Sequence, residues 1–284
     1  MNKYKLLKSF KNKRILITGN TGFVGSYLCL TLKLFGARIL GFSKKMKDKN
    51  YISNNKNFIK CFETIYDDIE NINIYKKKII NFKPHIIIHL ASQPIVKDSY
   101  VKTYSTYKTN VMGIVKLMEV AKDLKLTRNI VVFTSDKVYL DKGNTQLNEK
   151  SSIGGEDPYS SSKSSQDIIS NSYKLSFFKK SKNIIIIRAG NIIGGGDFQK
   201  TRLIPDIYLN GYKNKKIKIR NPFAIRPWQH ILDVISGLLS IISLKQKKIE
   251  KKSLIFNISP ISTPNLSVIK LLKKITILNK NKKL

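Results

Sequence analysis

A tyrosine and a lysine four residues apart form the pattern with the clearest chemical meaning in this sequence. Tyr159 and Lys163 follow Asp157-Pro158, a pair typical of a helix start, so both side chains project from one helical face. A neighbouring ammonium group lowers the pKa of a phenol from its ordinary value of ~10. Tyr159 could then take a proton from a substrate hydroxyl while the carbon that bears it gives hydride to a nicotinamide. The spacing alone is common by chance, and Ser135, a further hydroxyl at the end of a predicted strand, carries the interpretation.

Two ionisable residues, Asp136 and Lys137, come directly after this serine. Elimination of water needs one group that protonates the leaving hydroxyl and another that takes the proton of the adjoining carbon, which a keto group makes acidic. Asp136 and Lys137 are residue types that could fill these two roles. The alternative interpretation is an incidental charged loop at the end of a strand.

A glycine-rich turn stands near the N-terminus, with the spacing Gly19-x-x-Gly22-x-x-Gly25. It lies between a predicted strand, 14–18, and a predicted helix, 25–35. Glycines there permit a tight turn and let the backbone approach a pyrophosphate at the positive end of the helix. The turn predicts a dinucleotide site, and a plain strand-to-helix turn is the alternative.

Short β-branched runs alternate with helix-length segments along most of the chain, which predicts parallel strands joined by crossover helices. The predicted strands cover residues 14–18, 37–42, 85–90, 129–134 and 183–188. We therefore expect an α/β fold with a doubly wound parallel Rossmann sheet, whose ligands bind at the carboxyl ends of the strands. The alternation decays after about residue 192. We expect a dinucleotide-binding Rossmann domain with the catalytic residues over 12–190 and a smaller part, which the resemblance described below implies to bind the nucleotide sugar, over 191–284.

The end of the second strand leaves the choice between NAD and NADP open. An acidic residue there would hold the ribose hydroxyl of NAD, but the sequence has Ser43 followed by Lys44 and Lys45. The two lysines could suit the extra phosphate of NADP. His89 closes the third predicted strand, and we interpret it as a core histidine rather than a catalytic one.

The composition is strongly basic, with a formal net charge of +35, yet lysine supplies most of it: 46 Lys against 7 Arg. The lysines are spread over nearly the whole chain, and Ile and Asn are abundant too, so we attribute the charge to compositional drift rather than to nucleic-acid binding. No apolar run reaches the ~18 to 20 residues that a membrane span needs, and no signal peptide is recognisable. Two cysteines fit a reducing compartment. We expect a cytoplasmic protein that binds neither nucleic acid nor membrane.

Together, the glycine spacing and the Tyr-x-x-x-Lys pair resemble the extended short-chain dehydrogenase/reductase family, which remodels nucleotide sugars. The segment Thr134-Ser-Asp-Lys-x-Tyr139 is similar to the CDP-glucose 4,6-dehydratase branch, and so are the segments 188–197, 202–206 and 219–233. The resemblance implies NAD as cofactor, CDP-glucose as substrate, no metal ion, and a homodimer formed through the helix of Tyr159 and the one around 110–124. The implied product is CDP-4-keto-6-deoxyglucose. The resemblance further implies that Asp136 is the acid that expels the C6 hydroxyl and Lys137 the base at C5, which requires a depressed pKa for the lysine.

The resemblance also implies particular contacts. Those to the cofactor are made by Gly19, Gly22, Phe23, Val24, Gly25, Ser43, Asp68, Ile69, Leu90, Ala91, Thr109, Tyr159 and Lys163. Those to the nucleotide sugar are made by Ser92, Asn191, Arg202, Leu203 and Arg226. Asn191 can hydrogen-bond a sugar or phosphate oxygen, and the two arginines offer planar, permanent charge for a diphosphate.

The sequence departs from this branch in three places. Val24 stands where a lysine is common, Tyr139-Leu-Asp141 lacks the usual Glu-Asn sequel, and the chain ends at Leu284, before further C-terminal elements of the family. Three alternatives therefore stay open: another NAD-dependent nucleotide-sugar dehydratase or epimerase (dTDP-glucose, GDP-mannose), a truncated non-catalytic NAD-binding homologue, and a basic nucleic-acid binder.

Overall fold

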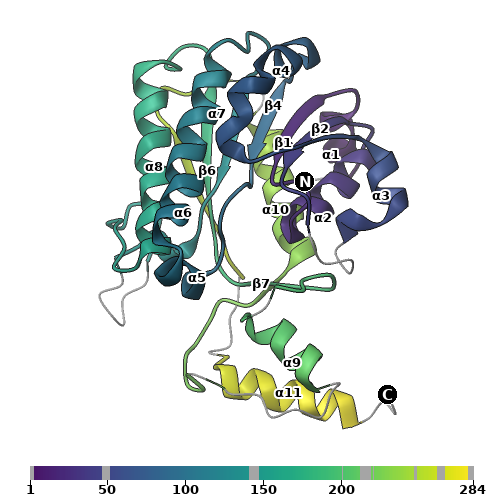
Figure 1. The fold of residues 1–284 in the computed structure, drawn as a ribbon, viewed down its shortest axis with the longest axis vertical. Helices are drawn as coiled ribbons and strands as arrows, with labels where there is room; N and C mark the ends of the chain where they lie inside the picture. Colours follow the sequence, from purple (N-terminus) through teal and green to yellow (C-terminus); the bar gives the residue numbers. More distant parts are fainter. Residues whose placement is uncertain are drawn as a thin grey trace.

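A seven-stranded, wholly parallel sheet forms the centre of the molecule, in the order β3-β2-β1-β4-β5-β6-β9 (Figure 1). The computed structural model describes residues 3–46, 52–140, 147–199, 201–211, 219, 221–245, 248–260 and 266–280. The strands are β1 (Arg14–Thr18), β2 (Arg38–Ser43), β3 (Glu63–Tyr66), β4 (Ile86–His89), β5 (Asn129–Phe133), β6 (Asn183–Ala189) and β9 (Leu254–Ile258). The predicted doubly wound sheet is confirmed.

Two hydrophobic cores cover the two faces of this sheet, because successive side chains of a strand point to opposite sides. Ile15 and Ile17 of β1 pack in one core with α2 (Phe23–Leu34) and α10 (Ile231–Leu244), and α1 (Lys3–Phe10) packs against α10. Leu16 points into the other core, with α7 (Gly113–Lys122) and α4 (Lys76–Phe82). The buried strands are nearly all apolar for this reason.

The second face also carries the helices that lead to the site. A π-helical turn, η3 (Lys108–Met112), joins α6 (Thr103–Tyr107) to α7, and α5 (Val96–Val101) precedes them. The long helix α8 (Pro158–Ser176) packs against α5, α6 and α7 and against β6. Shorter elements are η1 (Ile52–Asn54), α3 (Lys56–Cys61), η2 (Ile69–Tyr75) and η4 (Asp136–Val138).

The last part of the chain is divided between the sheet and a separate region. α10 and β9 follow residue 190 and yet belong to the sheet and its covering layer. The short strands β7 (Ile192–Ile193) and β8 (Gln229–His230) pair with each other. The helices α9 (Leu203–Gly211) and α11 (Val268–Lys280) lie beyond the carboxyl ends of the central strands (Figure 1). The division at residue 190 stays a prediction.

No helix within the described ranges is both long and apolar enough to cross a membrane.

Candidate active site

The residues Ser135, Asp136 and Lys137 leave the carboxyl end of β5, at the edge where the fold predicts ligands. Ser135 caps the short 3-10 helix η4, since its Oγ accepts a hydrogen bond of 3.2 Å from the Lys137 amide. The same hydroxyl donates to Oδ1 of Asp136 at 2.8 Å. The turn is therefore held in one geometry by its own side chains.

Helix α8 brings Tyr159 and Lys163 to the same place. Asp157 is its N-cap, with Oδ1 accepting from the Ser160 amide at 2.9 Å, and Pro158 follows in the first turn, as the sequence predicted. Tyr159 is 9% exposed and Lys163 3% exposed. The Ser135 hydroxyl hydrogen-bonds the Tyr159 phenol, and the Lys163 Nζ donates to the Phe133 carbonyl of β5 at 3.3 Å.

The electrostatics of this pair differ from the expected ones. Burial raises the pKa of Tyr159 to about 12, against the opposing effects of the Ser135 hydroxyl and of Arg202. Burial also lowers the pKa of Lys163 to about 7, although the charge of Asp167 opposes it. Loss of solvation outweighs the charge effects on both groups, because both side chains are almost fully buried. The phenol pKa near neutrality that the spacing predicted is not seen in this structure.

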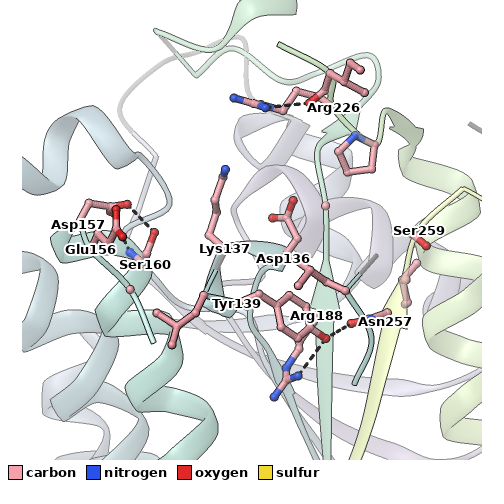
Figure 2. A pocket seen from close by; sticks show the side chains of 17 residues that line it. Asp136, Lys137, Tyr139, Glu156, Asp157, Ser160, Arg188, Arg226, Asn257 and Ser259 are labelled. Carbon is pink, nitrogen blue, oxygen red and sulfur yellow. Dashed lines mark hydrogen bonds between the residues drawn. The ribbon is translucent and has the colours of Figure 1, made fainter. Parts of the chain in front are cut away.

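A cavity of about 610 Å³ opens beside these residues, lined by groups of both charges. Asp136, Lys137 and Arg226 line it, and the Lys137 side chain rises between the start of α8 and the Arg226 side (Figure 2). Asp136 is half-buried, and desolvation raises its pKa while the Lys137 charge and the Ser135 hydrogen bond oppose the rise. A carboxyl group with a raised pKa is suited to donate a proton near neutral pH.

Several lining residues were not predicted from the sequence. Tyr139, Glu156, Asp157, Arg188 and Asn257 also line the cavity. Arg188 had a signal, since it is a lone cation in the otherwise apolar run of β6. The others come from loops or strand ends with no periodic pattern.

The glycine-rich turn has the crowding that a dinucleotide site requires. Gly19 has φ +76°, and a Cβ there would lie 2.6 Å from the Ala91 amide nitrogen. A Cβ at Gly25 would run into the Gly19 carbonyl oxygen, whereas one at Gly22 would meet only that oxygen, at 3.4 Å. Gly22 begins α2 with no side-chain cap, so the amides of the first turn are free to hold phosphate oxygens. These residues fit a dinucleotide.

Other predicted cofactor residues surround this turn. The Leu90 amide donates to the Thr18 carbonyl at 2.9 Å, which holds the loop after β4 beside the glycines. The Ser43 hydroxyl is hydrogen-bonded to Thr21 at 2.7 Å. Phe23 stacks edge-on against Tyr27, and Val24 packs against the core.

The adenine end of the predicted site lies around η2. Asp68 caps this helix and forms an ion pair of 2.5 Å with Lys44. Ile69 is buried against Gly113, where a Cβ would approach its Cγ2 to 2.7 Å. Thr109 lies half-buried in the π-helical turn η3. Such turns are frequent at functional sites.

His89, the last residue of β4, is buried. Its Nδ1 lies 2.7 Å from the Thr18 hydroxyl, and its Nε2 has no partner among the described residues. Burial, aided by the charge of Lys163, lowers the pKa of His89 to about 3. The ring is therefore neutral.

The predicted substrate residues are only partly brought together. Arg226 lines the cavity, and its Nη1 donates to the neighbouring Ile225 carbonyl at 2.8 Å. Arg202 forms an ion pair of 3.0 Å with Asp197, and Leu203 begins α9. The Asn191 carbonyl accepts from the Gln229 amide at 3.0 Å, and Ser92 is half-buried after β4. Asp141, in the departure noted above, lies outside the described residues. Within the described ranges, no group of three or more His, Cys, Asp or Glu side chains could hold a metal ion.

Comparison with known proteins agrees with this arrangement. A family model described as GDP-mannose 4,6 dehydratase matches residues 16–259. A CDP-glucose 4,6-dehydratase of Salmonella typhimurium is 37% identical over 239 residues, 82% of this chain and 67% of that protein. A dTDP-D-glucose 4,6-dehydratase of Dictyostelium discoideum is 31% identical over 79% of this chain and 54% of its own length.

A solved structure shows the same fold. The dTDP-glucose 4,6-dehydratase of Bacillus anthracis, in complex with NAD, superposes with a TM-score of 0.77 at 24% identity, over 95% of this chain and 82% of the other. The chain thus spans about two thirds and about half of the two sequence relatives. The resemblance drawn from the motifs is confirmed: the chain belongs to the GDP-mannose 4,6 dehydratase family of the extended short-chain dehydrogenase/reductases.

Proposed function

We propose that this chain is a nucleotide-sugar 4,6-dehydratase that uses NAD and converts CDP-glucose to CDP-4-keto-6-deoxyglucose. The observation that carries the proposal is the turn Ser135-Asp136-Lys137, which sets an acid and an amine side by side in a cavity next to Tyr159. The relative at 37% identity bears the name of this activity.

In the oxidation half of the reaction, Tyr159 takes the proton of the sugar C4 hydroxyl and Ser135 orients that hydroxyl. NAD, held by the glycine-rich turn of residues 19–25, would supply the acceptor for the C4 hydride and the hydride that is returned to C6. Because the pKa of Tyr159 is about 12, its phenolate is a strong base whose formation depends on nearby cations. We assign Lys163 and Arg202 as the cations that stabilise the Tyr159 phenolate.

In the elimination half, Asp136 protonates the leaving C6 hydroxyl and Lys137 takes the C5 proton. The raised pKa of Asp136 favours the protonated acid that this step requires. Lys137 is exposed in the cavity, where a flexible amine can reach the sugar ring. Arg226 on the opposite wall is assigned to the diphosphate.

Two parts of the chain have different roles. Residues 12–190 hold NAD and contribute the catalytic side chains, and residues 191–284 contribute to the nucleotide-sugar site. The enzyme acts in the cytoplasm as a homodimer. Support for the dimer comes from exposed apolar side chains on α5, α6 and α8, among them Val101 (81%), Tyr104 (78%) and Ile168 (59%).

The test is to incubate the purified protein with NAD and CDP-glucose and to follow the 4-keto-6-deoxy product by mass spectrometry. Tyr159→Phe is the inactive control. Turnover of dTDP-glucose or GDP-mannose without turnover of CDP-glucose would reject the substrate and favour the second candidate, which the 31% identity to a dTDP-D-glucose dehydratase supports. Binding of NAD without turnover of any of the three sugars would instead indicate a non-catalytic homologue.

A further inference from the structure

Arg188 is a buried cation at the base of the cavity. It belongs to β6, whose preceding four residues are isoleucines, and its side chain is 3% exposed. It nevertheless lines the cavity together with Asp136 and Lys137 (Figure 2). A buried guanidinium is costly unless its donors are satisfied, so its partners reveal what it does.

The first partner is Asp167, which is equally buried. Nε and Nη2 of Arg188 both donate to Oδ2 of Asp167, at 2.7 Å each. Asp167 lies one helical turn after Lys163 on α8, as Lys163 lies one turn after Tyr159, so the three share one face of the helix. Three buried charged groups thus follow one another: Arg188, Asp167 and Lys163.

The second partner is Tyr139, just after the turn η4. Nη1 of Arg188 donates to the Tyr139 hydroxyl at 2.9 Å, and the guanidinium carbon lies 4.8 Å from the ring centroid. The Tyr139 hydroxyl donates in turn to Oδ1 of Asn257 on β9 at 2.6 Å. Arg188 therefore links α8, the loop after β5 and the edge strand β9 through its own contacts and one relay.

We propose that Arg188 is a positioning residue of the active site, which favours the ionised form of Asp167 and, through Asp167, the positively charged form of Lys163. The charge of Lys163 serves catalysis only under the function proposed above, but the linkage among the three residues does not depend on it. Arg188 and Asp167 themselves are not among the residues assigned to CDP-glucose or to NAD.

The surroundings of Lys163 support this linkage. Its Nζ has two hydrogen-bond acceptors, the Phe133 carbonyl at 3.3 Å and Oε1 of Gln166 at 3.0 Å, and neither carries a charge. His89 of β4, which also faces it, is neutral because its pKa is about 3. The negative charge of Asp167 opposes the effect of burial on the pKa of Lys163. That pKa is about 7, so the charged and neutral forms of Lys163 are similarly populated at neutral pH.

Asp167 depends on Arg188 in the same way. Burial raises the pKa of Asp167, and the charge and hydrogen bonds of Arg188 oppose the rise most strongly, followed by Thr134 and Lys163. Without Arg188 the buried carboxylate would take up a proton and lose its effect on Lys163. Asp167→Asn and Arg188→Gln are therefore expected to change Lys163 alike, and their effects should not add.

The titration of Lys163 can be followed directly in the full chain without substrate or cofactor. Lysine labelled with carbon-13 at Cε gives NMR signals that shift on deprotonation, and the Lys163 signal is the one missing from Lys163→Met. The wild type should titrate near pH 7. Asp167→Asn and Arg188→Gln should each lower that midpoint by about one unit or more, and the double variant should lower it no further.

Two further variants separate charge from structure. Arg188→Lys keeps a cation beside Asp167 and should restore most of the wild-type midpoint. Tyr139→Phe removes the tyrosine hydroxyl that accepts from Nη1, leaves the Glu149 carbonyl as acceptor, and should leave the midpoint unchanged. An unchanged midpoint in folded Asp167→Asn overturns the proposal, and so does a Tyr139→Phe shift equal to that of Arg188→Gln. Failure of the proposed function would appear instead as an inactive wild type whose Lys163 still titrates as described.

Discussion

The Ser135 hydroxyl donates a hydrogen bond of 2.8 Å to Oδ1 of Asp136, the residue that follows it. The hydroxyl assigned to the oxidation half of the reaction is thus in contact with the acid assigned to the elimination half. Burial raises the pKa of Asp136, while this hydrogen bond and the charges of Lys137 and Arg226 oppose the rise. The acid proposed to protonate the leaving C6 hydroxyl therefore lies in the same short turn as the serine that orients the C4 hydroxyl.

Variants that lack either the proposed acid or the proposed base should separate removal of the C5 proton from loss of the C6 hydroxyl. In heavy water, Asp136→Asn should still exchange the sugar C5 hydrogen, because Lys137 can take and return that proton, but it should lose ~10²-fold or more of product formation. Lys137→Met should lose both the exchange and the product. Proton NMR of the recovered CDP-glucose measures the exchange, and mass spectrometry measures the product. Equal exchange in the two variants would reject the assignment of the base.

Two glycines of the same turn should respond differently to alanine. At Gly25 a Cβ would run into the Gly19 carbonyl, so Gly25→Ala should lower the melting temperature markedly. At Gly22 the nearest atom to a Cβ would be 3.4 Å away, so Gly22→Ala should fold normally. It should bind NAD about tenfold more weakly or worse, since the methyl group would occupy space that the dinucleotide-binding turn reserves for the pyrophosphate. Calorimetric titration measures NAD affinity, and thermal unfolding measures stability. An unaltered NAD affinity in Gly22→Ala would show that the pyrophosphate does not bind at this glycine.

The sequence predicted those parts of the fold that are recorded in local patterns. β1 runs from Arg14 to Thr18 as expected, because its apolar run is bounded by Arg and Gly. β3 was missed: it has four residues, begins with an exposed Glu63 and ends with a half-exposed Tyr66, so it lacks the apolar run of a central strand. β9 was missed because it follows a lysine-rich loop after the alternation of elements had decayed.

The site shows the same limit. The motif residues of α8 and of the turn after β5 were predicted together, since each motif carries its chemistry in a few adjacent positions. The partnership of Arg188 with Asp167 joins β6 to α8, and no spacing rule relates a strand cation to a helix carboxylate. Burial, which sets the pKa of Tyr159 and of Lys163, is likewise a property of the assembled core.

Lys174 has a structural role that could not be recognised in the sequence, because lysines are spread over nearly the whole chain. It is fully buried, and its Nζ donates to the carbonyls of Phe178, Lys179 and Lys182 at 3.1, 3.2 and 2.7 Å, beyond the end of α8. Lys174→Met would remove one donor from each of these carbonyls, of which the Phe178 carbonyl keeps the amides of Ser181 and Lys182, and should lower the free energy of unfolding by about 2 kcal/mol. Urea denaturation measures the loss, with the exposed Lys180→Met as matched control. Equal stability of the two variants would contradict the structural role.

His89 should make the protein sensitive to acid. Its pKa is about 3 in the folded state against an ordinary 6.5, so between these values the unfolded chain binds a proton that the folded protein does not. The free energy of unfolding therefore falls as the pH falls through this range, with a contribution approaching about 1.4 kcal/mol per pH unit. His89→Gln should lose less stability than the wild type between pH 6.5 and the onset of acid unfolding. Parallel stability curves for the two proteins would place the acid sensitivity elsewhere.

The proposed homodimer can be tested on the helices that carry exposed apolar side chains. Tyr104 of α6 and Ile168 of α8 are 78% and 59% exposed, and the two helices pack against each other on one face. Tyr104→Glu and Ile168→Lys should each shift the mass in light scattering from twice 32.5 kDa toward the single-chain value, because a charge buried in an interface lacks a partner.

A matched control for this experiment lies on the other side of the sheet. Leu34, at the end of α2, is 82% exposed, so Leu34→Lys introduces the same charge as Ile168→Lys at a comparable apolar site away from α6 and α8. It should leave the mass of the dimer unchanged. If Leu34→Lys dissociated the protein while Tyr104→Glu and Ile168→Lys did not, the subunits would meet through the α2 side of the sheet instead.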